Sequence, residues 1–494
     1  MITKRKILIP LLSAACALSC LAQDRAAQVL TLGQVIDRAR ANSVEAEMAL
    51  HQLRGSYWTY RSYRAELLPE LTFAGTLPAY RKQFSAYMND SGSYSFVPND
   101  YLQLNGELSV TQNIWLTGGK ISLSSSLDFY RQFGDNTFNR FMSLPVMLTL
   151  TQPIFGVNNI KWNRRIEPVR YEEACAEYMS ATEDVAAKAI QYYFALIMAE
   201  ENVDIARQNL ENATRLYEVA KEKRKMGSIS GNDLLQMELN LLDAGTDLTE
   251  RESDLKNSMF MLRSFLDLDT ETDISAEIPE GVPNVKVEFE DALDKALANN
   301  KFAKNQLRRQ LEADYEVSKA KGEQRQINLY AQLGLTGTGN TPGAAYSDIR
   351  ANRIIEIGFE IPLVDWGRRR GQVKVAESNR RLVESRLRQE QTDFRQNLYI
   401  LVERYGNQRQ LLEAARRADE IAQKRYNTNM ETFIIGKIST LDLNDSRVKK
   451  DEARREYVNE MYLYWLYYYQ IRSLTLWDYE RNTKLTMPDE ILKM

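Results

Sequence analysis

Four long stretches of the chain carry apolar residues at the three- and four-residue spacings of an α-helix. A helix of about sixty residues is roughly 90 Å long, far longer than the helices of ordinary globular domains. From Leu234 to Leu262 a Leu recurs every seventh residue, which is typical of helices that pack along a common seam. The pattern predicts two pairs of very long helices, at residues 162–226, 234–262, 373–432 and 443–476.

Residues 71–155 change to the two-residue period of β-strands. Apolar and polar positions alternate up to Leu116, a Thr-Gly-Gly-Lys turn follows, and the alternation resumes at Ile121. We expect two β-hairpins here, with the polar, Tyr- and Ser-rich residues 81–100 as a surface loop. One more hairpin is expected later in the chain, with strands at about residues 329–363 and residues 338–351 as its loop.

A motif of the form Gly-x-Ile-Ser-x-x-Asp-Leu separates the two helices of each pair. The Gly ends one helix in the left-handed conformation, and the Ser caps the next helix by accepting from free backbone N–H groups. The Asp gives the spacing of a capping box, with Asp in place of Glu or Gln. Each motif therefore predicts the tip of a helical hairpin, at residues 227–233 and 436–445. Its residues are Gly227, Ser230 and Asp233 in the first copy and Gly436, Ser439 and Asp442 in the second.

The two tips indicate a tandem duplication. Their offset, 436 − 227 = 209, also carries Tyr217 onto Tyr426, whereas the helices that begin at Leu32 and Phe289 differ by 289 − 32 = 257. The first repeat therefore contains about 48 additional residues before its tip, which the second of its two hairpins accounts for. We divide the chain into a signal peptide (1–22), a first repeat (23–266), a linker (267–287), a second repeat (288–476) and a C-terminal tail (477–494).

The start of the chain has the features of a secretory signal. Lys4, Arg5 and Lys6 precede an apolar run at residues 7–21, and cleavage after Ala22 fits the pattern. A lipoprotein signal, with a lipid on Cys20, is the other interpretation. No later run of about twenty apolar residues predicts a transmembrane helix.

The composition excludes several classes of function. A formal net charge of −3 offers no case for binding nucleic acid. A single His makes His-based metal or acid–base chemistry improbable. We find no candidate catalytic residues, no metal ligands and no cofactor motif, so we expect a protein that is not an enzyme.

A Tyr about ten residues before Gly-x-x-Ser-x-x-Asp-Leu, occurring twice, resembles the TolC family of outer-membrane efflux proteins. The resemblance implies a mainly α fold with a β part: a long α-helical barrel and an outer-membrane β-barrel shared by a homotrimer. Four strands per chain is the family norm, so the additional hairpin either makes six or lies outside the membrane. The few strands of one chain cannot close a barrel, and lipid does not tolerate an open sheet edge.

The function implied is that of a channel-tunnel in the outer membrane that extends into the periplasm. It would passively export substrates delivered by an inner-membrane efflux pump or secretion transporter and a periplasmic membrane-fusion adaptor. Its partners would be two further copies of itself, these proteins and outer-membrane lipid. The alternative is an exported coiled-coil or adhesive scaffold without a lumen.

The resemblance also implies roles for residues at the tips. Asp442 and Asp445 lie three apart, and matching acids in the family line a periplasmic aperture, where threefold symmetry makes rings of carboxylates. First-turn acids that stabilise a helix N-terminus are the simpler interpretation. Asp233 is the counterpart in the first repeat. The polar latch positions of the family are Phe433 and Ile438 here, so an apolar gate that includes Phe433 is a further candidate. Gly227, Ser230, Gly436 and Ser439 are the expected adaptor-docking positions.

Overall fold

The computed structural model describes residues 28–90, 92–134, 137–269, 272–324, 327–359, 364–434 and 437–487. The predicted signal peptide, Cys20 and Gly436 lie outside these residues. The chain divides into two compact units, which are described separately. The hairpin unit consists of the described parts of Met1–Ala39, Ala189–Gly281 and Ala422–Asn459, and the sheet unit of those of Arg40–Lys188, Val282–Ile421 and Glu460–Met494.

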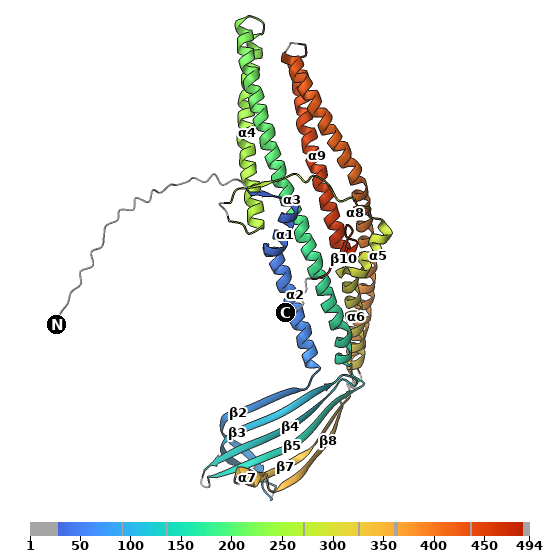
Figure 1. Ribbon diagram of the computed structural model, residues 1–494. Helices are drawn as coiled ribbons and strands as arrows, with labels where there is room; N and C mark the ends of the chain where they lie inside the picture. Colours follow the sequence, from blue (N-terminus) through green and yellow to red (C-terminus); the bar gives the residue numbers. More distant parts are fainter. Residues whose placement is uncertain are drawn as a thin grey trace, which may run out of the picture. The chain divides into compact units, whose positions relative to one another are not determined.

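The hairpin unit contains both predicted hairpin tips and the helix segments next to them. α3 (Asn159–Lys225) and α8 (Arg368–Ile434) have 67 residues each and contribute to both units. α4 (Gly231–Phe265) lies beside α3, and α9 (Thr440–Thr475) lies beside α8 (Figure 1). At 1.5 Å per residue the two longest helices extend about 100 Å. The prediction of very long paired helices is therefore confirmed.

A short parallel pair of strands closes the other end of this unit. β1 (Gln28–Leu30) pairs with β6 (Ile274–Ala276). The hydroxyl of Tyr193 lies 3.0 Å from the Leu30 carbonyl oxygen and 2.5 Å from that of Glu277. Tyr193 is fully buried, so a side chain of α3 ties the two strands to the helices.

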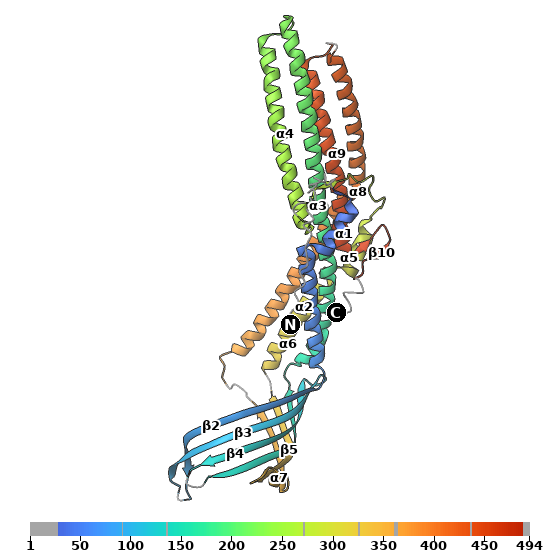
Figure 2. The same cartoon turned by 60° about the vertical axis from the view of Figure 1, so that its left-hand side comes forward.

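The sheet unit is built on one antiparallel sheet in the order β2-β3-β4-β5-β7-β8 (Figure 1). Figure 2 shows β2, β3, β4 and β5 side by side. The strands are β2 (Glu70–Met88), β3 (Tyr94–Ile114), β4 (Gly119–Phe133), β5 (Phe138–Ile154), β7 (Ile327–Gly339) and β8 (Ile349–Phe359). Strands from both sequence repeats thus join in a single sheet, through the pairing of β5 with β7. The additional hairpin belongs to this sheet, which has six strands in the part of the chain that the structure describes.

One expectation for this region was wrong. Residues 81–100 are not a surface loop, because β2 continues to Met88 and β3 begins at Tyr94. The polar residues of this stretch alternate with aromatic ones, and Lys82, Phe84 and Ala86 pair with Asp100, Pro98 and Phe96. Both faces of these strand ends are largely exposed, so their polar content does not prevent strand pairing. The later loop is also shorter than expected, since the short helix α7 (Pro342–Ala345) and the start of β8 lie within residues 338–351.

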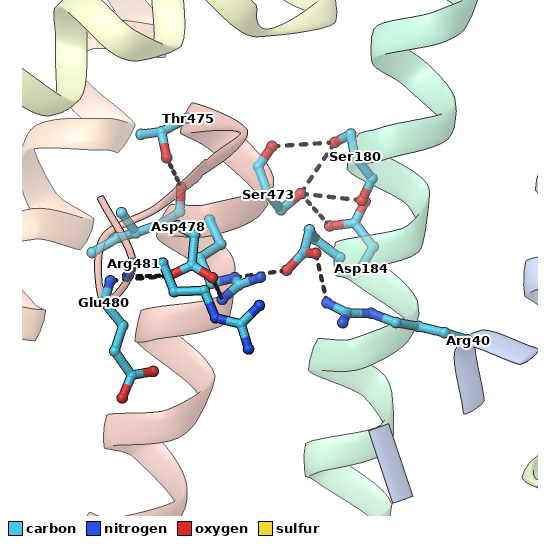
Figure 3. A network of polar contacts seen from close by, with 11 residues as sticks. Arg40, Ser180, Asp184, Ser473, Thr475, Asp478, Glu480 and Arg481 are labelled. Carbon is cyan, nitrogen blue, oxygen red and sulfur yellow. Dashed lines mark hydrogen bonds and ion pairs between the residues drawn. The ribbon is translucent and has the colours of Figure 1, made fainter. Parts of the chain in front are cut away.

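Helices and a small C-terminal hairpin complete the sheet unit. α2 (Val44–Glu66) and α6 (Lys301–Glu323) are connected to the sheet, and α5 (Phe289–Asn299) precedes α6. α1 (Leu32–Asn42) belongs to the hairpin unit up to Ala39. β9 (Trp477–Asp478) pairs with β10 (Thr483–Lys484). Ser473 near the end of α9 donates to Asp184 of α3 at 2.6 Å and contacts Ser180 (Figure 3). Across the described residues, none of the helices combines the length and apolar character that a membrane crossing requires.

Candidate functional site at the hairpin tips

At both tips the first helix of the hairpin ends with the same type of backbone hydrogen bond. In the first tip Gly227 has a φ of +74°, the left-handed region that favours glycine, and the Ser228 N–H donates to the Lys223 carbonyl at 2.9 Å. In the second tip the Lys437 N–H donates to the Thr432 carbonyl at 3.1 Å. Both residues of this second bond follow those of the first by 209 positions, the offset of the two sequence motifs.

Both second helices begin with a capping box. The Asp233 N–H donates to Ser230 Oγ at 3.1 Å, and the Ser230 N–H donates to Asp233 Oδ2 at 3.0 Å. At the other tip the same two bonds join Ser439 and Asp442, each at 3.2 Å. The prediction that Asp takes the usual place of Glu or Gln is therefore confirmed at both tips.

These bonds also fix the charge of the two capping carboxylates. The side-chain hydrogen bond from Ser230, followed by the backbone bond, lowers the pKa of Asp233. The Ser439 side chain and backbone lower the pKa of Asp442 in the same way, with a smaller contribution from Arg425. Both carboxylates are exposed and ionised at neutral pH, and each already has hydrogen-bond partners within its own tip.

Asp445 has a different partner. Its Oδ2 accepts from Arg425 Nη2 at 2.7 Å, across the second hairpin from α9 to α8. Both side chains are about half exposed. The negative charge of Asp445 is thus compensated by an ion pair with Arg425. The carboxylate of Asp442 instead accepts hydrogen bonds from Ser439. The structure brings the two acids to the first turns of α9, and it gives them different surroundings.

Phe433 contacts the other hairpin. Lys223 Nζ, in the last turn of α3, lies 5.7 Å from the centre of the Phe433 ring, within the range of a cation–π interaction. This contact joins α3 and α8 close to the two tips. Sequence reasoning identified Phe433 but missed Lys223 and Arg425. The three basic residues that end α3 were a visible signal, although nothing in the sequence gives their partners.

A groove of about 550 Å³ lies between the two hairpins behind the tips. The motif residue Tyr426 lines it, and its hydroxyl accepts from Asn212 Nδ2 at 2.8 Å. Lys450, which interrupts the apolar stripe of α9, is buried with its Nζ 4.9 Å from the Tyr426 ring centre and 3.2 Å from Asp451 Oδ1. Other lining residues include Met237, Asn240, Asp243, Leu441, Asn444 and Arg447.

Comparison with known proteins gives a consistent result. A family model described as "Outer membrane efflux protein" matches residues 35–266 and 292–474. No curated protein matches the chain significantly.

Solved structures of outer membrane channels have a similar fold. The CmeC outer membrane channel of Campylobacter jejuni aligns with a TM-score of 0.67 at 16% identity, covering 94% of this chain and 88% of that one. The outer membrane protein VceC of Vibrio cholerae gives 0.63 at 14% identity, with 90% and 96% covered. The open state of the MtrE channel of Neisseria gonorrhoeae gives 0.58 at 13% identity, with 90% and 88% covered.

Proposed function

Because this chain belongs to the outer membrane efflux protein family and is an outer-membrane efflux channel that extends into the periplasm, we propose that three copies form one continuous export duct. Family membership confirms the resemblance to the TolC family and the mixed helical and β fold. It does not favour the alternative of an exported coiled-coil or adhesive scaffold without a lumen. The observation that supports the trimer is the open sheet: among the described residues of one chain, β2 and β8 each pair with a single neighbour. An unpaired strand edge is not stable in lipid, so further copies have to supply the missing partners.

The duct acts passively within a tripartite system. An inner-membrane pump or secretion transporter supplies the energy, and a periplasmic adaptor connects it to the duct. The channel itself then requires a continuous aqueous path and a closable end, and no catalytic group. This division of labour agrees with a family of channels that are not enzymes.

The hairpin tips are the proposed closable end. Threefold symmetry would repeat Asp442 and Asp445 around the axis and create rings of carboxylates that favour cations. The Arg425–Asp445 pair would partly neutralise the second ring, so Asp442 would contribute more to the attraction. Asp233 of the first repeat, also capping a helix, is the weaker candidate. Phe433, held against Lys223, would supply an apolar constriction.

The tips also form the proposed adaptor-docking surface. Gly227, Ser230 and Ser439 lie at turns whose backbone is fixed by local hydrogen bonds. Gly436, the counterpart of Gly227, is included because of the sequence duplication. A rigid turn that needs no reorganisation on binding favours association, since little conformational entropy is lost.

The decisive experiment is purification from outer membranes followed by planar-bilayer recording. We expect heat-resistant trimers in detergent and discrete ion-conducting steps in lipid. A monomeric particle that never conducts would contradict the proposed duct. Export by whole cells, with and without a candidate pump and adaptor, then identifies the system that the channel serves.

A further inference from the structure

One face of the sheet carries a row of exposed apolar side chains that crosses five of its six strands. Neighbouring residues in the strand register place Leu71 beside Val110, and the row continues through Leu123, Leu148 and Leu333. These five side chains are between 38% and 66% exposed in one chain. Phe73, Leu108, Val146 and Leu335 form part of a second exposed row. Water-exposed apolar surface of this extent indicates contact with lipid or with another protein.

The opposite face is polar and internally hydrogen-bonded. On β3 and β4, Thr111 contacts Ser122 at 3.1 Å, and Asn105 Nδ2 donates to Asp128 Oδ1 at 3.0 Å. Gln103 Nε2 donates to the Tyr130 hydroxyl at 2.9 Å. These bonds join the second strand of the first hairpin to the first strand of the next, so the two hairpins share one polar surface. Apolar residues on one face and polar residues on the other are the pattern of a transmembrane barrel wall.

The lengths and directions of the strands also fit a shared wall. β7 and β8 have 13 and 11 residues, close to the roughly 9–11 residues that a tilted strand needs to cross a membrane. β2 and β3 have 19 and 21 residues and therefore extend beyond the membrane. All neighbours in the six-stranded sheet are antiparallel, so β2 and β8 run in opposite directions. The β8 edge of one copy can thus pair antiparallel with the β2 edge of the next.

From this geometry we infer that every strand of the sheet lies in the barrel wall and that the assembled barrel has eighteen strands, three times six. The inference rests on the proposed trimer and adds that neither hairpin of the first repeat lies outside the membrane. With strands about 4.8 Å apart and tilted by about 40°, eighteen strands give a barrel roughly 36 Å across, against roughly 24 Å for twelve. An eighteen-stranded barrel leaves an aqueous channel, so the narrowest point of the duct lies elsewhere. Arg353 places one charge on the apolar face of the edge strand β8, where its long side chain can extend to the lipid headgroups.

Cysteine accessibility tests the inference strand by strand. In a Cys175→Ser background, single cysteines replace Val110, Leu148 and Leu333 on the apolar face. The matched controls replace the adjacent residues on the polar face: Ser109, Thr149 and Gln332. A water-soluble maleimide is applied to isolated outer membranes. We expect the three control cysteines to react at least ten times faster than the three apolar-face cysteines.

The results separate the inference from the proposed function. If Val110→Cys reacts as fast as Ser109→Cys while Leu148→Cys and Leu333→Cys stay protected, the first hairpin lies outside the membrane and the inference is wrong. If all three apolar-face cysteines react rapidly, the sheet is not in lipid and the proposed duct is wrong as well.

A cross-linking experiment tests the contact between copies. Phe73→Cys on β2 is combined in turn with Ala351→Cys, Arg353→Cys, Ile355→Cys and Ile357→Cys on the apolar face of β8, and the membranes are oxidised. We expect at least one pair to give covalent dimers and trimers. The control pairs Ser125→Cys, on the central strand β4, with the same β8 positions and should give none. Stable conducting trimers in which no β2–β8 pair cross-links would overturn the proposed contact.

Discussion

Arg472, near the end of α9, donates from Nε to Oε2 of Glu183 on α3 at 3.0 Å, and the two side chains are only 9% and 4% exposed. Glu183 also accepts from Arg40 at 2.5 Å, and Arg472 donates to Asp478 of the C-terminal hairpin at 3.0 Å (Figure 3). Two guanidinium groups and two carboxylates therefore balance one another in a largely buried network, in which the Arg40 side chain is 26% exposed. The network holds the last turn of α1, α3, α9 and the C-terminal hairpin together within the sheet unit.

Removing Glu183 should destabilise the protein strongly. Glu183→Ala leaves Arg472 buried with fewer partners, and breaking a buried pair in this way costs about 3–5 kcal/mol. We expect a clear fall in the temperature at which the proposed trimer dissociates in detergent. The matched control is Glu218→Ala, which removes the exposed Lys221–Glu218 pair and should cost less than about 1 kcal/mol. Equal effects of the two substitutions would show that the buried network contributes no more than a surface pair.

Stability should fall as the pH rises from about 4.5 to about 7, because of Glu200. Burial raises the pKa of this carboxyl from 4.5 to about 7, against a smaller opposite effect of the Ala276 N–H. The folded protein therefore binds more protons than the unfolded chain in this window, and deprotonation favours unfolding.

Glu200→Gln keeps the neutral form and should remove this part of the pH dependence. The measurement compares the dissociation temperature of wild type and variant at pH 5 and pH 8. The variant should gain relative to wild type at pH 8 and not at pH 5. An identical pH dependence in the two proteins would contradict the assigned role of Glu200.

The capping boxes should stabilise the tips locally. Loss of a Ser N-cap typically costs about 1 kcal/mol, so Ser230→Ala and Ser439→Ala should each speed hydrogen exchange in the first turn of the following helix about fivefold. Ser228→Ala is the control, because the hydrogen bond of Ser228 at the tip uses its backbone N–H. Exchange that is as fast in Ser228→Ala as in Ser230→Ala would argue against a specific capping effect.

Substitutions around Asp445 should change cation block in opposite directions. Asp442→Ala and Asp445→Ala remove carboxylates from the proposed aperture and should weaken block by multivalent cations added on the periplasmic side. Arg425→Ala removes the cation 2.7 Å from Asp445 and should strengthen block. Single-channel recording at fixed ionic strength measures all three. Unchanged block in every variant would remove these residues from the pore.

Local signals in the sequence predicted the tips well. A capping box and a glycine turn depend on residues a few positions apart, so their spacing in the sequence is enough to predict their hydrogen bonds. The long helices followed from periodicity over many turns. Partners on other helices, such as Lys223 for Phe433 or Asp445 for Arg425, depend on how the helices pack, and the sequence gives no direct information about that packing.

The sheet illustrates what the sequence could not predict. Alternation predicted the hairpins, but the loop at residues 81–100 was wrong because composition alone does not distinguish an exposed strand from a loop. The sequence also left open whether the additional hairpin joins the others. That answer depends on the pairing of β5 with β7, which brings Ile154 beside Ile327. The burial of Lys450 beside Tyr426 also depends on the packing of α9 against α8, which the sequence does not show.

The pairing of β5 with β7 also sets the order in which the protein can mature. Strands separated by α3, α4, α5 and α6 meet only after the second repeat has been synthesised and exported, and contacts between such distant segments form slowly. Until then the edge of β5 that later pairs with β7 leaves backbone N–H and C=O groups unpaired in an aqueous compartment, a state prone to aggregation. The interval with an unpaired edge is therefore longer than in proteins whose strands pair only with their neighbours in sequence.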